Sequence, residues 1–226
     1  MKEASIRECL EFFDENQYRY KIFCKSVLAF FEENERLNMR PLPCIHSLKF
    51  RIKSRESLEH KLNRKWNKGV EVTKLNFGKE ITDVCGIRVL HIYNGQFPII
   101  HEEIMKNITI HKEWVLFEQP KAYIWDKEKE IEYQKMGLVV ETKDSYYTSF
   151  HYVIKPNEES DICCEIQVRT LFEEAWGEID HTINYPDKTK SIACAEQIKV
   201  MARLVNAGSR LADAIFTSYK EHASLK

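Results

Sequence analysis

The N-terminal part of the chain carries apolar side chains at the spacing of a helix. Between residues 5 and 36 they recur with a period of about 3.6, at Cys9, Leu10, Phe13, Tyr20, Cys24, Val27, Leu28 and Phe31. This pattern predicts one long helix, which the prolines of the segment 39–43 end. A second helix is predicted to begin at Ser54, where a polar cap precedes a new apolar stripe.

Shorter runs of alternating or β-branched apolar residues predict strands. Six segments fit this pattern, 45–52, 85–93, 114–124, 138–142, 147–155 and 162–169, and a sheet of about five strands is predicted from them. Another helix is predicted at 97–108, and the chain from Thr170 onward is predicted to be helical because Thr170 and Glu173 form a capping-box pattern. This order of elements predicts an α+β domain with a single mixed β-sheet flanked by helices.

The composition is that of a globular chain, which we expect to be cytoplasmic. Of the 226 residues, 43% are apolar and 31% are charged, which excludes collagen-like, low-complexity and disordered classes. No apolar run approaches the roughly 18 residues of a membrane span, and charged residues are spread through positions 1–13, where a signal peptide is apolar. The seven cysteines form no C-x-x-C pair, so free and mostly buried thiols are expected.

Charges of opposite sign are separated along the chain, although the net charge is only −1. Residues 49–74 contain nine Lys and Arg against three acids, whereas residues 158–180 contain eight acids against Arg169 alone. A fold that opposes these two segments would suit phosphates bridged by divalent cations. Because the chain has neither a G-x-G-x-x-G nor a G-x-x-x-x-G-K-[ST] motif, phosphate chemistry would depend on side chains.

The basic segment can bring several cations to one place. Strand alternation puts Arg51 and Lys53 on one face, and Ser57 and Lys61 lie one helical turn apart just beyond them. Such a group of cations with a hydroxyl can bind a triphosphate, with Arg pairing bidentately to phosphate or stacking on a purine. The alternative interpretation is a solvated basic helix face.

The strand at 162–169 places Glu165, Gln167 and Arg169 on the face opposite its apolar residues. Polar side chains on a strand built for burial need partners or a ligand. The alternative is an edge strand with one wet face.

Two further groups could contact a nucleotide or its metal. Tyr147, Ser149 and His151 share one strand face, which indicates a surface on which a nucleobase stacks, with a hydrogen-bond donor for phosphate beside it. The alternative is that they are ordinary half-buried strand residues. Asp83, at the mouth of the strand that follows it, is either a turn residue or, with Glu165, a ligand for Mg²⁺.

These residues belong to four motifs: Arg51-x-Lys53-x-x-x-Ser57-x-x-x-Lys61, Asp83-x-x-Gly86-x-Arg88, Tyr147-x-Ser149-x-His151, and Glu165-Ile166-Gln167-Val168-Arg169-Thr170 followed by Trp176 and His181. Together, across about residues 45–185, they resemble the RelA/SpoT synthetase domain, with flanking helices at 5–36 and 191–222 as in the small stand-alone synthetases. The resemblance implies one nucleotidyltransferase-like domain over residues 1–226. It also implies a GTP pyrophosphokinase-like enzyme that moves the β,γ-pyrophosphate of ATP to the 3′-hydroxyl of GDP or GTP, makes (p)ppGpp and releases AMP.

The resemblance also implies a role for each motif residue. ATP would be bound by Arg51, Lys53, Ser57, Lys61, Arg88, Gln167 and Arg169. Asp83 would hold Mg²⁺, and Glu165 would bind the metal or take the proton from the 3′-hydroxyl. The acceptor would contact Tyr147, which stacks on the guanine, together with Lys143, His151, Glu174 and Asp180.

This sequence departs from the family pattern just before Tyr147. The residues there are Ser145 and Tyr146, where the family usually has a Gly-containing pair. Glu174 and Asp180 stand where family members place polar groups that read guanine, and a carboxylate can accept hydrogen bonds from its N1–H and exocyclic amine. No His-Asp dipeptide occurs, and no length is left for regulatory C-terminal domains, so the protein is expected only to synthesise.

Three functional hypotheses follow. The first is an alarmone synthetase acting on GDP or GTP. The second is a toxin that pyrophosphorylates the 3′-CCA end of tRNA and is neutralised by an antitoxin, with Arg19, Lys21 and Lys25 gripping the acceptor stem. The third is a catalytically dead nucleotide-binding module, which the intact Asp83 and Glu165 disfavour. A homo-oligomer is compatible with each, and no membrane contact is expected.

Overall fold

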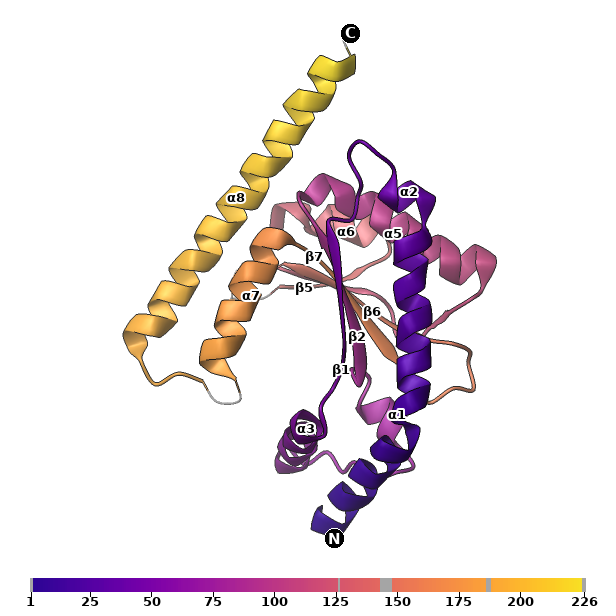
Figure 1. Ribbon diagram of the computed structural model, residues 1–226. Coiled ribbons are helices and arrows are strands. Elements are labelled where there is room, and N and C mark those ends of the chain that lie inside the picture. The colour runs from indigo at the N-terminus through magenta and orange to yellow at the C-terminus, as the bar shows by residue number, and fades with distance from the viewer. Residues whose placement is uncertain (1, 126, 143–147, 186–187, 225–226) are drawn as a thin grey trace.

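The computed structural model describes residues 2–125, 127–142, 148–185 and 188–224 (Figure 1). Its α-helices within these ranges are α1 (Lys2–Glu33), α2 (Glu35–Asn38), α3 (Arg55–Asn67), α4 (Phe77–Glu80), α5 (Phe97–Lys106), α6 (Glu130–Lys135), α7 (Leu171–Asn184) and α8 (Ile192–Ser224). The strands are β1 (Ser47–Ile52), β2 (Cys85–His91), β3 (Val115–Leu116), β4 (Lys121–Ile124), β5 (Val139–Thr142), β6 (Ser149–Lys155) and β7 (Cys164–Thr170). Short turns of other helix types occur at η1 (Asn94–Gln96), η2 (Asn107–His111) and η3 (Lys127–Lys129).

The strands form one mixed sheet, so the α+β class predicted from the element order is confirmed. In the part of the chain that the structure describes, the sheet has seven strands in the order β1-β2-β7-β6-β4-β5, with β3 paired to β6. The pairs β2–β7 and β4–β5 are parallel, and the others are antiparallel. Parallel pairing of β2 with β7 puts two strands that are far apart in sequence side by side at the centre.

Two predicted elements are divided in the structure. The segment 114–124 forms β3 and β4 rather than one strand, because Pro120 has no N–H for a ladder hydrogen bond. The predicted helix 5–36 ends at Glu33, and α2 begins after Asn34, whose extended backbone lets its side chain accept from the Leu37 amide at 3.0 Å. The sheet therefore has more strands than the pattern indicates.

Helices cover both faces of the sheet. The apolar side of α1 packs on the β1, β2 and β7 side chains in the main core, and α7 lies across the opposite face (Figure 1). Strand alternation serves this arrangement, since Cys85, Ile87 and Val89 are fully buried on the α1 side while Gly86 and Arg88 face the α7 side. The α7 face is thus where polar side chains of the central strands are available.

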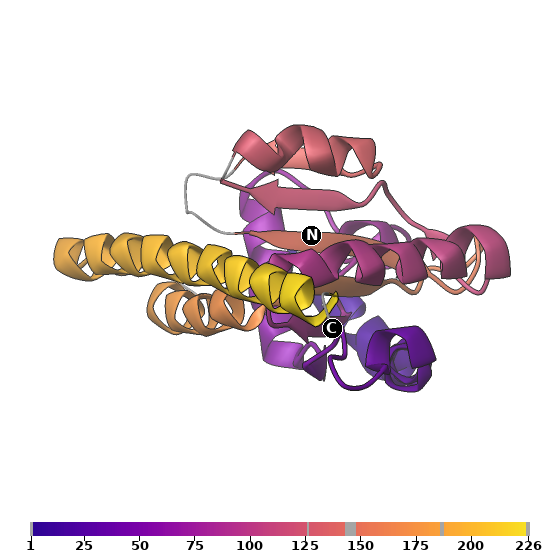
Figure 2. The same ribbon diagram turned by 90° about the horizontal axis from the view of Figure 1, so that it is seen from above.

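A second, smaller core joins α7 to α8. Trp176 packs with Ile198 and Ala202, and its indole N–H donates to the Ile198 carbonyl at 3.1 Å. Gly208 lets α8 approach closely, because a Cβ there would lie 3.0 Å from the Phe172 ring. Seen from above, α8 runs alongside α7 and reaches beyond the sheet (Figure 2). Among the residues described, no helix has the length and apolar character needed to cross a membrane.

Replacing Gly78 by alanine is expected to destabilise the fold. Gly78 lies in α4, and a Cβ there would overlap the backbone carbonyl of Asp161. Because the obstacle is backbone rather than a flexible side chain, we expect the free energy of unfolding to fall by about 1–3 kcal/mol. Urea unfolding followed by circular dichroism measures it. The control Lys79→Ala, at an exposed position of the same helix, should change it by less than about 0.5 kcal/mol. Equal stability of the two variants would contradict the close approach.

Candidate active site

The basic side of the site is built by the end of β1 and the start of α3. Ser54 caps α3 by accepting from the Ser57 amide at 3.1 Å, and its hydroxyl donates to the Ser57 hydroxyl at 2.9 Å. This cap sets the direction of the helix, so that Lys61 one turn later reaches back toward the strand. Ser57 itself is half-buried at the helix start and is not among the residues that line the central cleft.

Two lysines of this segment meet at Asp83. Lys61 Nζ lies 2.6 Å from one carboxylate oxygen, and Lys53 Nζ lies 3.2 Å from the other. Burial raises the pKa of Asp83, but the charges of Lys61 and Lys53 more than offset this and lower it below its ordinary value. Asp83 is therefore ionised at neutral pH.

The second carboxylate of the site, Glu165, belongs to a chain of polar contacts on β6 and β7. His151 Nδ1 lies 3.0 Å from one oxygen of Glu165, and the Gln167 amide donates to the other at 2.8 Å. Arg169 in turn donates to the side-chain amide oxygen of Gln167 at 3.1 Å. Burial and the charge of Asp83 raise the pKa of Glu165, but the contacts with His151 and Gln167 outweigh them, so the pKa lies below its ordinary value. Glu165 is therefore also ionised at neutral pH.

His151 is held in place by its surroundings. The Tyr123 ring meets it edge-on, with centroids 4.7 Å apart. Its Nε2 is buried and has no hydrogen-bond partner among the described residues, although its Nδ1 contacts Glu165. A buried ring nitrogen without a partner is the kind of group that a bound ligand satisfies.

Glu174 is a buried anchor for three cations. Its carboxylate lies 2.8 Å from Lys49 Nζ, 3.0 Å from Arg88 and 3.0 Å from Arg169 Nε, and it is only 5% exposed. Burial raises its pKa, but the hydrogen bond from Lys49 and the charges of Arg169 and Arg88 lower it below the ordinary value. Two of these three cations, Arg88 and Arg169, are residues that the sequence predicts to bind ATP.

Some of these groups line one cleft of about 280 Å³, whereas Lys53, Lys61, His151 and Glu174 lie behind the lining and contact residues in it. Its lining consists of Lys49, Phe50, Arg51, Asp83, Gly86, Ile87, Arg88, Glu165, Gln167, Glu178 and His181. An adjoining hollow of about 410 Å³ shares Arg51, Arg88, Gln167 and His181 and adds Arg169 and Asp180. The basic segment and the acidic segment therefore do face each other, and both carboxylates lie with Arg51 and Arg88 in one cleft.

Two residues predicted from the sequence cannot be placed, and two residues of the site were not predicted. Lys143 and Tyr147 lie outside the described residues. The missed residues are Lys49, which pairs with Glu174, and Glu178, which contacts Arg88. Both carried a signal: Lys49 shares the strand face of Arg51, and Glu178 lies one helical turn after Glu174.

Comparison with known proteins gives the family. A family model described as the region found in RelA and SpoT proteins matches residues 50–190. The chain belongs to the RelA/SpoT family. The resemblance seen in its motifs is thereby confirmed, and the matched region contains Arg51, Asp83, Arg88 and Glu165.

Relatives of this RelA/SpoT protein include the GTP pyrophosphokinase YwaC of Bacillus subtilis, 26% identical over 146 residues. That match covers 62% of this chain and 59% of the relative, so the chain spans less than two thirds of its length. A GTP pyrophosphokinase family protein from Streptococcus pneumoniae has a TM-score of 0.67 at 18% identity, with 96% of each chain covered.

Small alarmone synthetase 1 of Bacillus subtilis, solved with its product pppGpp, has a TM-score of 0.63 at 19% identity. The comparison covers 91% of this chain and 98% of that one. At this identity, both structural matches show that the fold is that of the synthetases.

Acid is expected to weaken the fold through Glu174. The pKa of Glu174 is lower in the folded protein than its ordinary value of 4.5, so the ionised carboxylate stabilises the fold. This stabilisation is complete above pH 4.5 and is lost as the pH falls through the folded pKa. The free energy of unfolding should therefore fall between about pH 6 and pH 3, and fall less steeply in Glu174→Gln, which cannot ionise there. Urea titrations across this range measure both slopes. Asp83 and Glu165 titrate in both proteins, so identical slopes would exclude Glu174 as a source of the loss.

Proposed function

We propose that this protein is a pyrophosphokinase that moves the β,γ-pyrophosphate of ATP to the 3′-hydroxyl of an acceptor nucleoside and releases AMP. The observation that carries the proposal is the single cleft in which ionised Asp83 and Glu165 lie with Arg51 and Arg88. Phosphoryl-transfer enzymes act mainly by positioning and by neutralising charge, which this set of groups can do. Intact, ionised carboxylates also disfavour a catalytically dead module.

ATP is the donor that the basic side of the cleft suits. Lys53 and Lys61 bring two point charges to Asp83, and Arg51 and Arg88 bring two planar guanidiniums to the same cleft. Lysine suits phosphate oxygens, and arginine can pair with phosphate or stack on adenine. Ser57, Gln167 and Arg169 remain proposed ATP contacts.

Asp83 and Glu165 fit a site for Mg²⁺. They are hard oxygen donors, both ionised, and close enough for the charge of Asp83 to raise the pKa of Glu165. When bound, the ion would neutralise charge on the transferred phosphates. Lys53 and Lys61 keep Asp83 ionised, and His151 and Gln167 fix the orientation of Glu165.

Glu165 is also the proposed general base. It is ionised, so it can accept the proton of the acceptor 3′-hydroxyl, and its contacts with His151 and Gln167 hold its carboxylate in place. His151 is placed to stabilise Glu165 and, through its unpartnered Nε2, to contact the acceptor.

GDP or GTP is the proposed acceptor, and (p)ppGpp the product. Support comes from the relatives, one named a GTP pyrophosphokinase and one solved with its product pppGpp. Tyr147 and Lys143 are proposed to stack on guanine and to contact its phosphates. Because the Glu174 carboxylate is occupied by three cations, Asp180, in the adjoining hollow, is the better candidate to read the guanine edge.

The 3′ end of tRNA is the second candidate acceptor. A hollow of about 350 Å³ on α3 favours a polyanion, since its lining includes His60, Lys61, Arg64 and Lys68. The cations of α1 do not contribute, because this helix covers the sheet face opposite the cleft. Arg19, Lys21 and Lys25 are thus not placed to hold an acceptor stem at the site.

Substitution of either carboxylate is expected to abolish transfer. Asp83→Asn and Glu165→Gln keep the size of each side chain but remove the metal ligand or base, which should lower kcat by at least about 10²-fold. The assay incubates each protein with γ-labelled ATP, Mg²⁺ and GDP, GTP or deacylated tRNA and records which acceptor becomes labelled. Glu80→Gln is the control, because Glu80 pairs with Lys65 outside the cleft. Turnover near the wild-type rate in either site variant would remove that residue from the mechanism.

Asp180 is expected to discriminate guanine from hypoxanthine, which lacks the exocyclic amine. A hydrogen bond from that amine to a carboxylate contributes about 1.5–3 kcal/mol, so wild-type kcat/KM for GDP should exceed that for IDP by roughly 10- to 150-fold. Asp180→Ala should bring the two values together. A preserved preference in this variant, with circular dichroism unchanged, would assign guanine recognition to another residue.

A further inference from the structure

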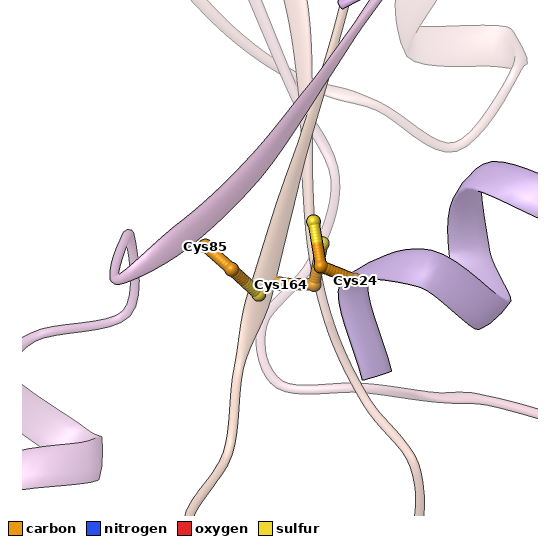
Figure 3. Close-up of side chains that lie close together, drawn as sticks. All are labelled: Cys24, Cys85 and Cys164. Atoms are coloured by element: carbon orange, nitrogen blue, oxygen red, sulfur yellow. The ribbon is translucent and has the colours of Figure 1, made fainter. Parts of the chain in front are cut away.

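Three buried thiols meet on the face of the sheet that is opposite the cleft. Cys24 comes from α1, Cys85 from β2 and Cys164 from β7, and their sulfur atoms all lie within 4.8 Å of one another (Figure 3). Each residue is fully buried. Cys85 and Cys164 are direct partners in the parallel strand pair, and α1 supplies the third sulfur.

The donor set of this cluster is soft. No histidine or carboxylate joins the group within the described part of the chain. Thiolate ligands select ions such as Cu(I) and Zn²⁺ over Mg²⁺ or Ca²⁺. A metal–sulfur bond of about 2.3 Å brings ligand sulfurs to roughly 3.8–4.0 Å apart, so the cluster needs to contract by less than about 1 Å.

The number of donors decides between the two soft ions. Structural Zn²⁺ sites are almost always four-coordinate, and an open zinc site takes water as its fourth ligand. Here the three sulfurs are fully buried, so solvent does not reach them to supply a fourth ligand. Cu(I) is a closed-shell ion that is stable with three sulfur ligands, and it meets this set without an added group.

We propose that Cys24, Cys85 and Cys164 form a binding site for one Cu(I) ion. Each copper–sulfur bond replaces an S–H bond, and the proton passes to bulk solvent while the core opens locally to admit the ion. The copper stays Cu(I), so no oxidant or reductant takes part.

The site is directly behind the two carboxylates of the cleft. Cys85 follows Asp83 by two residues, and Cys164 immediately precedes Glu165 on β7. Since the core is close-packed, contraction of the sulfur cluster shifts these strands rather than being absorbed locally. Occupancy by copper is therefore expected to disturb the cleft and slow transfer. This consequence rests on the proposed function, whereas binding of the ion does not.

The binding test uses the reduced, full-length protein under argon. Cu(I) is titrated in competition with a colorimetric Cu(I) chelator, and X-ray absorption at the copper edge gives the ligands. We expect one equivalent that resists the chelator and three sulfur ligands per copper. The proposal would be overturned if the protein did not retain Cu(I) against the chelator, or if fewer than three sulfur atoms were bound to the copper. A parallel titration with Zn²⁺ should show weaker retention, and a tightly held four-coordinate zinc would overturn the assignment to Cu(I).

Variants locate the ligands. Outer-shell partners of a metal alone contribute about 10- to 100-fold to affinity, so loss of a ligand in Cys24→Ser or Cys164→Ala should lower Cu(I) affinity by more than about 100-fold. Cys9→Ala is the matched control, because Cys9 lies on the same helix, is equally buried and contacts the Val72 carbonyl instead. Equal loss in the control would refute the site. If a ligand variant does not fold, the copper-edge spectrum of the wild type still decides.

The consequence for transfer has its own readout. One equivalent of Cu(I) should lower the transfer rate of the wild type and of Cys9→Ala, and should leave Cys24→Ser unaffected. Inhibition that is equal in all three proteins would place the inhibitory copper elsewhere. If the protein transfers no pyrophosphate at all, the proposed function fails, but the titration and the copper-edge spectrum still test the site.

Discussion

The parallel pairing of β2 with β7 is the constraint on which the rest of the site depends. It sets Gly86 opposite Glu165 and Arg88 opposite Gln167, although these residues are separated by about eighty positions in the chain. One strand follows directly from Asp83 and the other carries Glu165. A parallel pair needs a crossover connection, here the long segment 92–163, so this geometry exists only when the whole sheet has formed.

Compensation of charge is the second constraint. Asp83 is held by two lysines, Glu165 by His151 and Gln167, and Glu174 by Lys49, Arg88 and Arg169. Buried carboxylates without such partners would take up protons. The cleft thus keeps its acids ionised and its cations oriented before any nucleotide binds, which reduces the ordering that binding must impose.

The two faces of the central strands serve different purposes. The α1 face is built mainly from apolar side chains and cysteines, and the α7 face carries the charged groups. Because successive side chains on a strand point to opposite faces, Cys164 and Glu165 are neighbours in sequence but lie on opposite sides of the sheet. A change on one face therefore reaches the other through a single strand.

Local patterns in the sequence determined much of this protein. Periodicity and alternation predicted the main helices and strands and the α+β class. They also predicted that Arg51 shares a face with Lys53, and Glu165 with Gln167. These features depend on neighbours along the chain. The position of Asp83 before a buried strand indicated a metal ligand, and the family resemblance added Arg88 as an ATP contact. Tertiary structure alone decided that Glu174 anchors three cations and that Cys24 meets Cys85 and Cys164, because those contacts join α1, β1, β2, β7 and α7. No local spacing encodes a distance between elements that only folding brings together.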